Sequence, residues 1–286
     1  MSGLYVNDEG TWKLPKVVWI NQGTTWRVCK NVYVNNGGFW QELIRTIDIS
    51  GSKSNFNLFE FVGKPTKALS LVVNVLSGVE IFSQDTDGSS NVNFNRRSPA
   101  FTVGDFPAGS AIIINNNGYI SGGGGFGGPG AYRNGSYFNP QINGYNGGDG
   151  IVKGSSNNFD ITVANTGTIA GGGGGGGGGQ QRYVCPPIAP NIYDSGCGWV
   201  DGNKGGQGAG ITGASRTQGG SPMTRPAYGQ SSQPNTATGG FGGALGDDGQ
   251  GNGQENQNRS VGGAGGKAIG SGIEIAVSGT IIGAVG

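Results

Sequence analysis

The sequence predicts a β-structured first part, residues 1–120, followed by a bundle of polyglycine-II helices, with essentially no α-helix. Three observations predict this fold class: a repeat of fourteen residues near the N-terminus, short alternating apolar runs before residue 120, and a large excess of glycine after it. Of the 286 residues 63 are Gly, and 51 of these follow residue 120. Ordinary usage of about 7% would give only about 20 in the whole chain. We therefore divide the chain into residues 1–46, 47–120 and 121–286.

The N-terminal repeat has three units, and each contains a β-prone run, an Asn/Gly turn signal and a Trp, which predicts a strand, a turn and a strand. Three positions of each unit recur with this spacing: Val6, Ile20 and Val34; Asn7, Asn21 and Asn35; Trp12, Trp26 and Trp40. A unit this short cannot bury a Trp by itself, because one such side chain covers 150 to 250 Å². Either the three Trp pack on one another, or three similar units present aromatic surface to a partner with threefold symmetry.

The middle part, residues 47–120, reads as ordinary β-structure that supplies a conventional hydrophobic core. Short apolar runs alternate there with Gly, Asn, Asp and Pro, and none has a helical period of useful length. The strands that we expect span residues 56–62, 69–76, 79–83, 101–106 and 111–114.

A strand phrase that recurs around the glycine-rich part argues against a disordered tail, which is the usual interpretation of such a composition. It reads IIINNNGYISGGGG at 112–125, ITVANTGTIAGGGG at 161–174 and IEIAVSGTIIGAVG at 273–286. Each copy places apolar residues two apart, as one face of a strand requires. We expect the three strands to pair beside each other and to bracket the glycine-rich chain.

A period of three runs through the glycine-rich part, where Gly-Gly separates Thr238, Phe241 and Ala244, and likewise Val261, Ala264 and Lys267. A polyproline-II-type helix has three residues per turn and no internal hydrogen bonds, so buried copies must bond sideways to their neighbours. The nine consecutive glycines 171–179 would span about 28 Å in this conformation and suit a helix surrounded by others. The sequence therefore predicts a packed bundle of polyglycine-II helices.

Four segments between the glycine runs have a different composition: residues 131–143, 180–201, 211–237 and 252–260. They combine Tyr, Trp and Arg with Ser, Gly and Asn, a mixture typical of binding loops. Loops that join rods emerge at the ends of the bundle, where we expect recognition; the alternative is that some aromatic residues fold back as lids over the bundle. The candidate recognition residues are Tyr132, Arg133, Tyr137, Phe138, Tyr183, Ile188, Ile192, Tyr193, Trp199, Met223, Arg225 and Tyr228.

Two of the three cysteines, Cys185 and Cys197, bracket a Pro-rich loop of thirteen residues. A disulfide there would restrict the unfolded loop by roughly 3 kcal/mol on the chain-entropy model. Free thiols are the alternative, because a reducing cytosol keeps cysteines reduced during synthesis. We expect Cys29 to stay unpaired.

The composition argues against most catalytic and nucleic-acid functions. The chain has no His, which excludes Ser-His-Asp and Cys-His pairs and nearly every catalytic zinc site. The net charge is +1 without a Lys/Arg cluster, so phosphate backbones are poor partners. Neither a signal peptide nor a membrane-spanning run is expected. We therefore expect a non-enzymatic protein without cofactor or metal; only a convergence of Asp194, Asp201 and Glu255 in space would leave a cleaving activity open.

The phrase ITVANTGTIAGGGGGGGGG (161–179), the alternation of glycine runs with other segments, and GGFW (37–40) before a β-rich stretch resemble the Gly-rich adhesins at the tips of long tail fibres in T-even-type bacteriophages. The resemblance covers most of the chain, most strongly from about residue 111. It implies a virion protein, fixed through its N-terminal part to the distal end of a trimeric fibre. It also implies that loops at the end of a polyglycine-II sandwich recognise an outer-membrane protein or lipopolysaccharide. Such proteins are made in the host cytoplasm and act outside the cell.

Two other functions compete with this interpretation. A tail-fibre assembly chaperone would be absent from purified virions. An ice-binding polyglycine-II protein would show regular triplets throughout and a flat face of small residues, whereas the triplets here are brief and the loops are long and aromatic.

Overall fold

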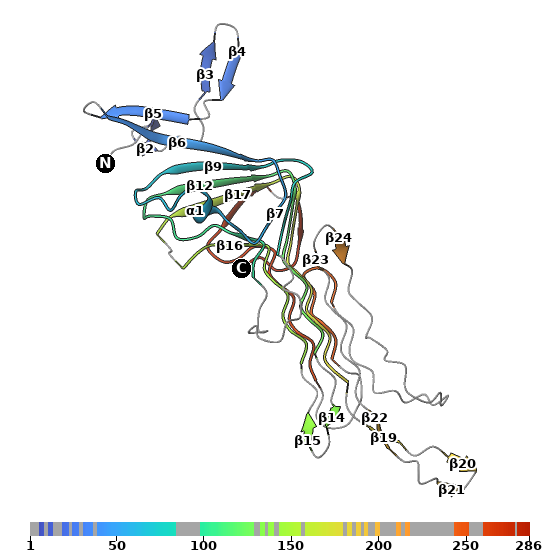
Figure 1. Cartoon of the computed structure of the whole chain (residues 1–286). Coiled ribbons are helices and arrows are strands. Elements are labelled where there is room, and N and C mark those ends of the chain that lie inside the picture. Colours follow the sequence, from blue (N-terminus) through green and yellow to red (C-terminus); the bar gives the residue numbers. More distant parts are fainter. Residues whose placement is uncertain are drawn as a thin grey trace.

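The structure is a computed structural model, shown in Figure 1, and it describes residues 44–83, 98–128, 143–155, 158–179, 243–251, 260–277 and 279–286 in full. Elsewhere it describes only the backbone of short strands. Nearly all regular elements are β-strands, as expected, and the single helix of the described residues has four residues. No helix in these ranges has the length and apolar character needed to cross a bilayer.

Three parallel sheets form the body of the protein. The long sheet contains, in spatial order, β25 (Glu274–Val277), β17 (Asp160–Asn165), β12 (Ala111–Asn116), β9 (Ser70–Val75) and β6 (Phe39–Ile49), with β5 (Asn31–Asn36) antiparallel at its edge. The middle sheet contains β26 (Thr280–Ile282), β18 (Thr168–Ala170), β13 (Tyr119–Ser121), β10 (Glu80–Phe82) and β7 (Lys53–Ser54). The short sheet contains β16 (Ile151–Val152), β11 (Phe101–Thr102) and β8 (Phe56–Asn57).

The chain winds through these sheets as a three-sided β-helix. Each turn adds one strand to the long sheet, one strand to the middle sheet and one position to the short sheet. Each of these strands pairs in parallel with the corresponding strand one turn away. In the last two turns Ile269 and Val285 occupy the short-sheet position through single parallel bridges. The copies of the strand phrase therefore lie beside each other as predicted, since β12 pairs with β17 and β17 with β25.

Apolar side chains at paired positions fill the interior of the β-helix. Strands β9 and β12 alternate half-buried and buried residues, as a strand with one face in the core does. The paired, buried ladders are Val73, Ile114 and Val163 in the long sheet; Ile81, Ile120 and Ile169 in the middle sheet; and Phe56, Phe101, Ile151 and Ile269 in the short sheet. Burying one such side chain contributes about 1.5–3 kcal/mol, so this core supplies the main hydrophobic stabilisation.

Asn and Gly form the corner between the long and middle sheets. The buried Asn116 donates from Nδ2 to Oδ1 of Asn165 (2.8 Å), and Asn165 donates to the carbonyl oxygen of Thr280 (3.1 Å). A Cβ at Gly167 would collide with the carbonyl oxygen of Gly118 one turn away. The shared Asn-x-Gly of the first two phrases is therefore explained by hydrogen bonding and close approach at this corner.

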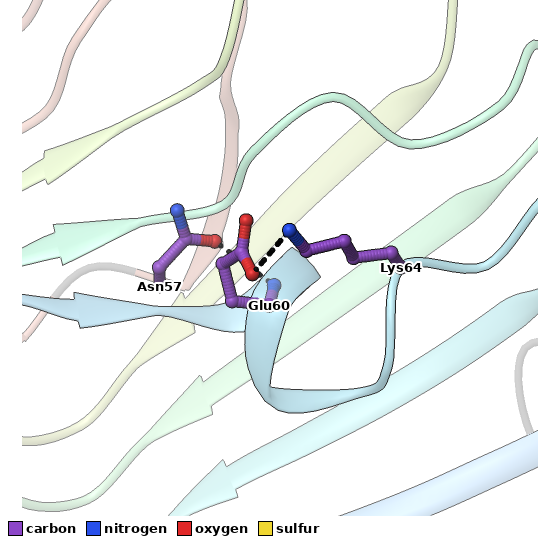
Figure 2. A network of polar contacts seen from close by, with 3 residues as sticks. All are labelled: Asn57, Glu60 and Lys64. Carbon is purple, nitrogen blue, oxygen red and sulfur yellow. Dashed lines mark hydrogen bonds and ion pairs between the residues drawn. The ribbon is translucent and has the colours of Figure 1, made fainter.

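Two expected strands are shorter than predicted. Residues 56–62 form β8 and then helix α1 (Leu58–Phe61), because the Asn57 side chain caps the helix by accepting from the amide of Glu60 (3.1 Å; Figure 2). An exposed ion pair joins Lys64 Nζ to Glu60 (2.9 Å; Figure 2) and adds little stability in water. In the expected strand 101–106 only β11 is regular, and Gly104 follows with a φ of +91°.

The expected division at residues 46 and 120 differs from the arrangement of the sheets. Strand β6 runs without interruption through residue 46. Strands β17, β18, β25 and β26, all after residue 120, share sheets with the middle part. The glycine-rich segments are therefore inserted between strands of a β-helix that the chain resumes at its C-terminal end.

Candidate functional site

The glycine-rich insertions leave the β-helix at one corner, between the middle and short sheets. We call residues 122–128, 143–150, 171–179, 243–251 and 260–267 the glycine bundle. Its segments 122–128 and 171–179 follow β13 and β18 directly, whereas segments 143–150 and 260–267 lead back to β16 and to Ile269. In Figure 1 they extend together as long rods away from the three sheets.

The rods are held by backbone hydrogen bonds that run sideways and recur every third residue. The amides of Gly122, Gly125 and Gly128 donate to the carbonyls of Ala170, Gly173 and Gly176 at 3.0, 2.8 and 2.7 Å. Exposure follows the same period in segment 260–267, where Val261, Ala264 and Lys267 are exposed and the glycines between them are partly or fully buried. The period of three that the sequence predicts is thus present in the bonding and in the burial.

The nine-glycine run lies at the centre of the bundle, and all nine residues are buried. It donates to segment 143–150 through Gly172 and Gly175, and to segment 243–251 through Gly174 and Gly177. It accepts from segments 122–128, 243–251 and 260–267. A buried backbone needs such partners for its polar groups, and neighbouring rods supply them here.

At its buried glycine positions the bundle leaves no room for a Cβ, because the neighbouring backbones approach too closely. A Cβ added at Gly174 would lie inside van der Waals contact with the carbonyl group of Gly263 and 2.8 Å from the amide nitrogen of Gly249. Gly144, Gly147 and Gly172 would meet neighbouring carbonyl oxygens in the same way. Sideways bonding with this period fits polyglycine-II helices, and the helix type itself stays a prediction.

The register of the β-helix continues into the rods. Strand β13 pairs with β18 up to Ser121 and Ala170, and the bonds from Gly122 to Ala170 and from Gly125 to Gly173 follow directly, each spanning 48 residues of the chain. On the returning side the bridge between Ile151 and Ile269 continues into the bonds from Gly150 to Lys267 and from Gly147 to Ala264. The sheets therefore align these rods.

The predicted recognition segment 131–143 contains a hairpin of β14 (Tyr132–Asn134) and β15 (Tyr137–Asn139). Tyr132 and Arg133 lie on its first strand and Tyr137 and Phe138 on its second, with Arg133 opposite Phe138. Figure 1 places this hairpin at the end of the bundle remote from the sheets.

The segment 180–201 contains two hairpins rather than a plain loop. Strand β19 (Arg182–Val184) pairs with β22 (Gly198–Val200), which sets Tyr183 opposite Trp199. Between them β20 (Pro187–Ala189), which carries Ile188, pairs with β21 (Ile192–Tyr193). Both hairpins also lie at the remote end in Figure 1. Cys185 and Cys197 fall outside the described residues.

The segment 211–237 is described only at its start, where β23 (Gly210–Thr212) pairs with β24 (Ser215–Thr217). Figure 1 shows this hairpin well apart from β14–β15, nearer to the sheets. Met223, Arg225 and Tyr228, together with most of segment 252–260, lie outside the described residues.

The fourteen-residue units form strand pairs with one common register. Strand β1 (Val6–Asp8) pairs with β2 (Thr11–Lys13), β3 (Trp19–Gln22) with β4 (Thr25–Val28), and β5 with β6. In each pair the repeated Asn faces the repeated Trp: Asn7 with Trp12, Asn21 with Trp26, and Asn35 with Trp40. The predicted pairing of two strands in each unit is confirmed, and Cys29 lies outside the described residues.

The sequence analysis missed a set of polar side chains in the bundle. Oδ1 of Asn143, Asn146 and Asp149 accepts a hydrogen bond from the backbone amide of Val261, Ala264 and Lys267, respectively, at 2.8 Å in each case. Their spacing of three residues, each followed by Gly, was the available signal. No cluster of three or more His, Cys, Asp or Glu that could hold a metal occurs among the fully described ranges.

Comparison with known proteins defines the class as a phage adhesin. A family model described as phage tail fibre adhesin Gp38 matches residues 44–286, so the chain belongs to this family. Among solved structures the chain is similar to the gp37-gp38 adhesin tip complex of the bacteriophage S16 long tail fiber, with 22% identity and a TM-score of 0.48 over 86% of this chain and 83% of that chain. No curated protein matches the chain.

Replacing Gly174 by Ala is expected to destabilise the bundle by at least about 1–3 kcal/mol, because the new methyl group overlaps two neighbouring backbones. Hydrogen–deuterium exchange of the 171–179 amides and thermal unfolding measure the effect. The matched control is Gly51→Ala, where nothing lies within 4 Å of an added Cβ. Equal stability of the two variants would contradict the close packing described above.

Proposed function

We propose that this protein is the receptor-binding adhesin at the tip of a phage tail fibre, and that hairpins at the outer end of the glycine bundle bind a host outer-membrane protein or lipopolysaccharide. The family supports an adhesive role. The observation that carries the loop assignment is the position of β14–β15 and β19–β22 at the remote end of the rods. These strands carry nine of the candidate recognition residues.

The bundle suits this role because it is a stiff support made almost entirely of backbone. We infer that its rods are polyglycine-II helices, since buried glycines bond sideways with a period of three. A rigid scaffold lowers the entropic cost of presenting loops to a receptor. Tyr, Trp and Arg then supply contact area at the end of that scaffold.

Recognition by segment 211–237 and by Met223, Arg225 and Tyr228 remains part of the proposal. The hairpin β23–β24 at its start lies apart from the other hairpins in Figure 1. We therefore rank segments 131–143 and 180–201 first as receptor contacts.

We further propose that Cys185 and Cys197 form a disulfide. This proposal is supported by the pairing of Val184 with Gly198 in the β19–β22 ladder, because these two residues are the chain neighbours of the cysteines. Mass spectrometry of the alkylated protein, with and without reduction, is expected to show two additional alkylated thiols after reduction only. Full alkylation without reduction would contradict the bridge, and Cys29 serves as the internal control for a free thiol.

The N-terminal part is proposed to attach the protein to a trimeric tail-fibre protein. Three strand pairs with the same Asn–Trp register offer three similar contacts, which suits a single chain on a threefold partner. The protein would be made in the host cytoplasm, be carried on the virion, and act outside the cell.

Exchanging residues 131–143, 180–201 and 211–237 one at a time with those of a relative of different host range is expected to move host choice with at least one exchange, first with 180–201. Adsorption of particles to both hosts measures this outcome. Exchange of the surface segment 63–68, which lies on the β-helix between α1 and β9, is the control and is expected to leave host choice unchanged. Host choice that follows none of the three exchanges would refute the loop assignment.

Replacing Trp26 by Ala is expected to weaken attachment to the fibre by at least about 2 kcal/mol, roughly 30-fold, if this Trp is an interface anchor. The amount of protein retained on purified particles measures the change, and Trp26→Phe is the matched control that keeps an aromatic ring. Undiminished retention with an intact fold would contradict the attachment role. Absence of the wild-type protein from particles would favour an assembly chaperone instead.

A further inference from the structure

We infer that Asn143, Asn146 and Asp149, which we call the Asx ladder, are positioning residues that lock together the two rods returning from the receptor-binding end. The inference rests on the proposed function, because it takes the hairpins at the outer end of the rods to be the part that binds the receptor. It concerns how segments 143–150 and 260–267 are aligned, and which side chains do this.

Each step of the Asx ladder makes two bonds to one residue of the opposite rod. The side chain of Asn146 accepts from the amide of Ala264 (2.8 Å), and the amide of the following Gly147 donates to the carbonyl of the same Ala264 (2.9 Å). Asn143 with Gly144 clamps Val261 in the same way, and Asp149 with Gly150 clamps Lys267. Six bonds therefore join the two rods over three successive triplets.

The ladder lies where the bundle meets solvent. Val261, Ala264 and Lys267 are the exposed residues of their triplets, and Asn143 and Asn146 are exposed as well. The side-chain oxygen occupies the place that the carbonyl of a further rod would fill in the interior. Asp149 is 7% exposed at the base of the ladder, and its carboxylate accepts the same bond as the two amide side chains.

The sheets align the rods only at their base, and side chains can keep this alignment farther out, where a glycine rod has no register of its own. Sliding one all-glycine rod past another by three residues restores the same set of backbone bonds. Sliding segment 143–150 by one or two residues would remove every Asx oxygen from its amide, and sliding by three would leave one step of the ladder without its partner. The separation along the chain is 118 residues at all three steps, the same as in the bridge between Ile151 and Ile269.

The position of the ladder connects it to recognition. Asn143 comes four residues after the end of β15 at Asn139, and Val261 directly follows segment 252–260. Fixing Asn143 to Val261 holds the return from the hairpin against the return from the second insertion. The ladder thus sets where β14–β15 stands relative to the rest of the bundle.

The experiment compares two double variants of the full chain on phage particles: Asn143→Ala with Asn146→Ala, and Asn143→Asp with Asn146→Asp. The Ala pair removes both acceptors, and the Asp pair keeps them, as Asp149 does naturally. In the Ala pair we expect hydrogen–deuterium exchange of the Val261 and Ala264 amides to be about five- to tenfold faster, because each amide loses one net hydrogen bond. The amides of Ile114 and Val163 in the β-helix should be unchanged, and adsorption to a bacterial strain that wild-type particles infect should fall. The Asp pair should retain both wild-type exchange and wild-type adsorption.

Three results would overturn the inference: unchanged exchange at Val261 and Ala264 in the Ala pair, equal losses in the Ala and Asp pairs, or faster exchange with undiminished adsorption. If the double variant does not fold, the single variant Asn146→Ala repeats the first test with only one exposed residue changed. Its measurement is hydrogen–deuterium exchange of the Ala264 amide. Failure of the proposed function would give a different result. Host choice would then follow none of the segment swaps, while hydrogen–deuterium exchange of the ladder amides would still be as described here.

Discussion

The sideways hydrogen bond between two bare glycine backbones is the interaction on which the architecture depends. Ordering glycine is costly, because it loses more conformational freedom than any other residue. Each net backbone bond returns only about 0.5–1.5 kcal/mol, so the arrangement is favourable only when most of the bonds are made together. The structure meets this condition in the nine-glycine run, which forms at least one backbone bond with every other segment of the bundle and is buried along its whole length. Side chains are excluded there by geometry, since an added Cβ would overlap a neighbouring carbonyl.

The β-helix provides what the glycine bundle lacks. Its paired Ile, Val and Phe residues bury apolar surface in the usual way, and its parallel strands fix the starting register of each rod. Because the rods leave and return at one corner, their first bonds simply extend the ladder of the sheets. The bundle is therefore aligned at its base by sheet pairing and along its exposed side by the Asx ladder.

This division of labour separates the support from the hairpins that we propose to bind the receptor. Backbone bonds between glycines are independent of what the intervening segments contain, so hairpins of different sequence fit on the same rods. The family membership supports an adhesive role for such a construction. These hairpins carry aromatic and basic residues in their sequences, with Tyr183 paired to Trp199 and Arg133 to Phe138 along the backbone.

The sequence by itself determined the features that are periodic and local. The spacing of the Trp units, the alternation in the strand phrases and the triplets at Val261, Ala264 and Lys267 each follow from the repeat length of one element, and the structure has all three. The pairing of the three strand phrases was also predicted, whereas the partners of each glycine run became visible only in the folded chain. The fold also makes a helix of residues 58–61 and sets the Asx ladder against amides 118 residues away. Such pairings depend on loop closure and on competition among many similar glycine runs, which no local period encodes.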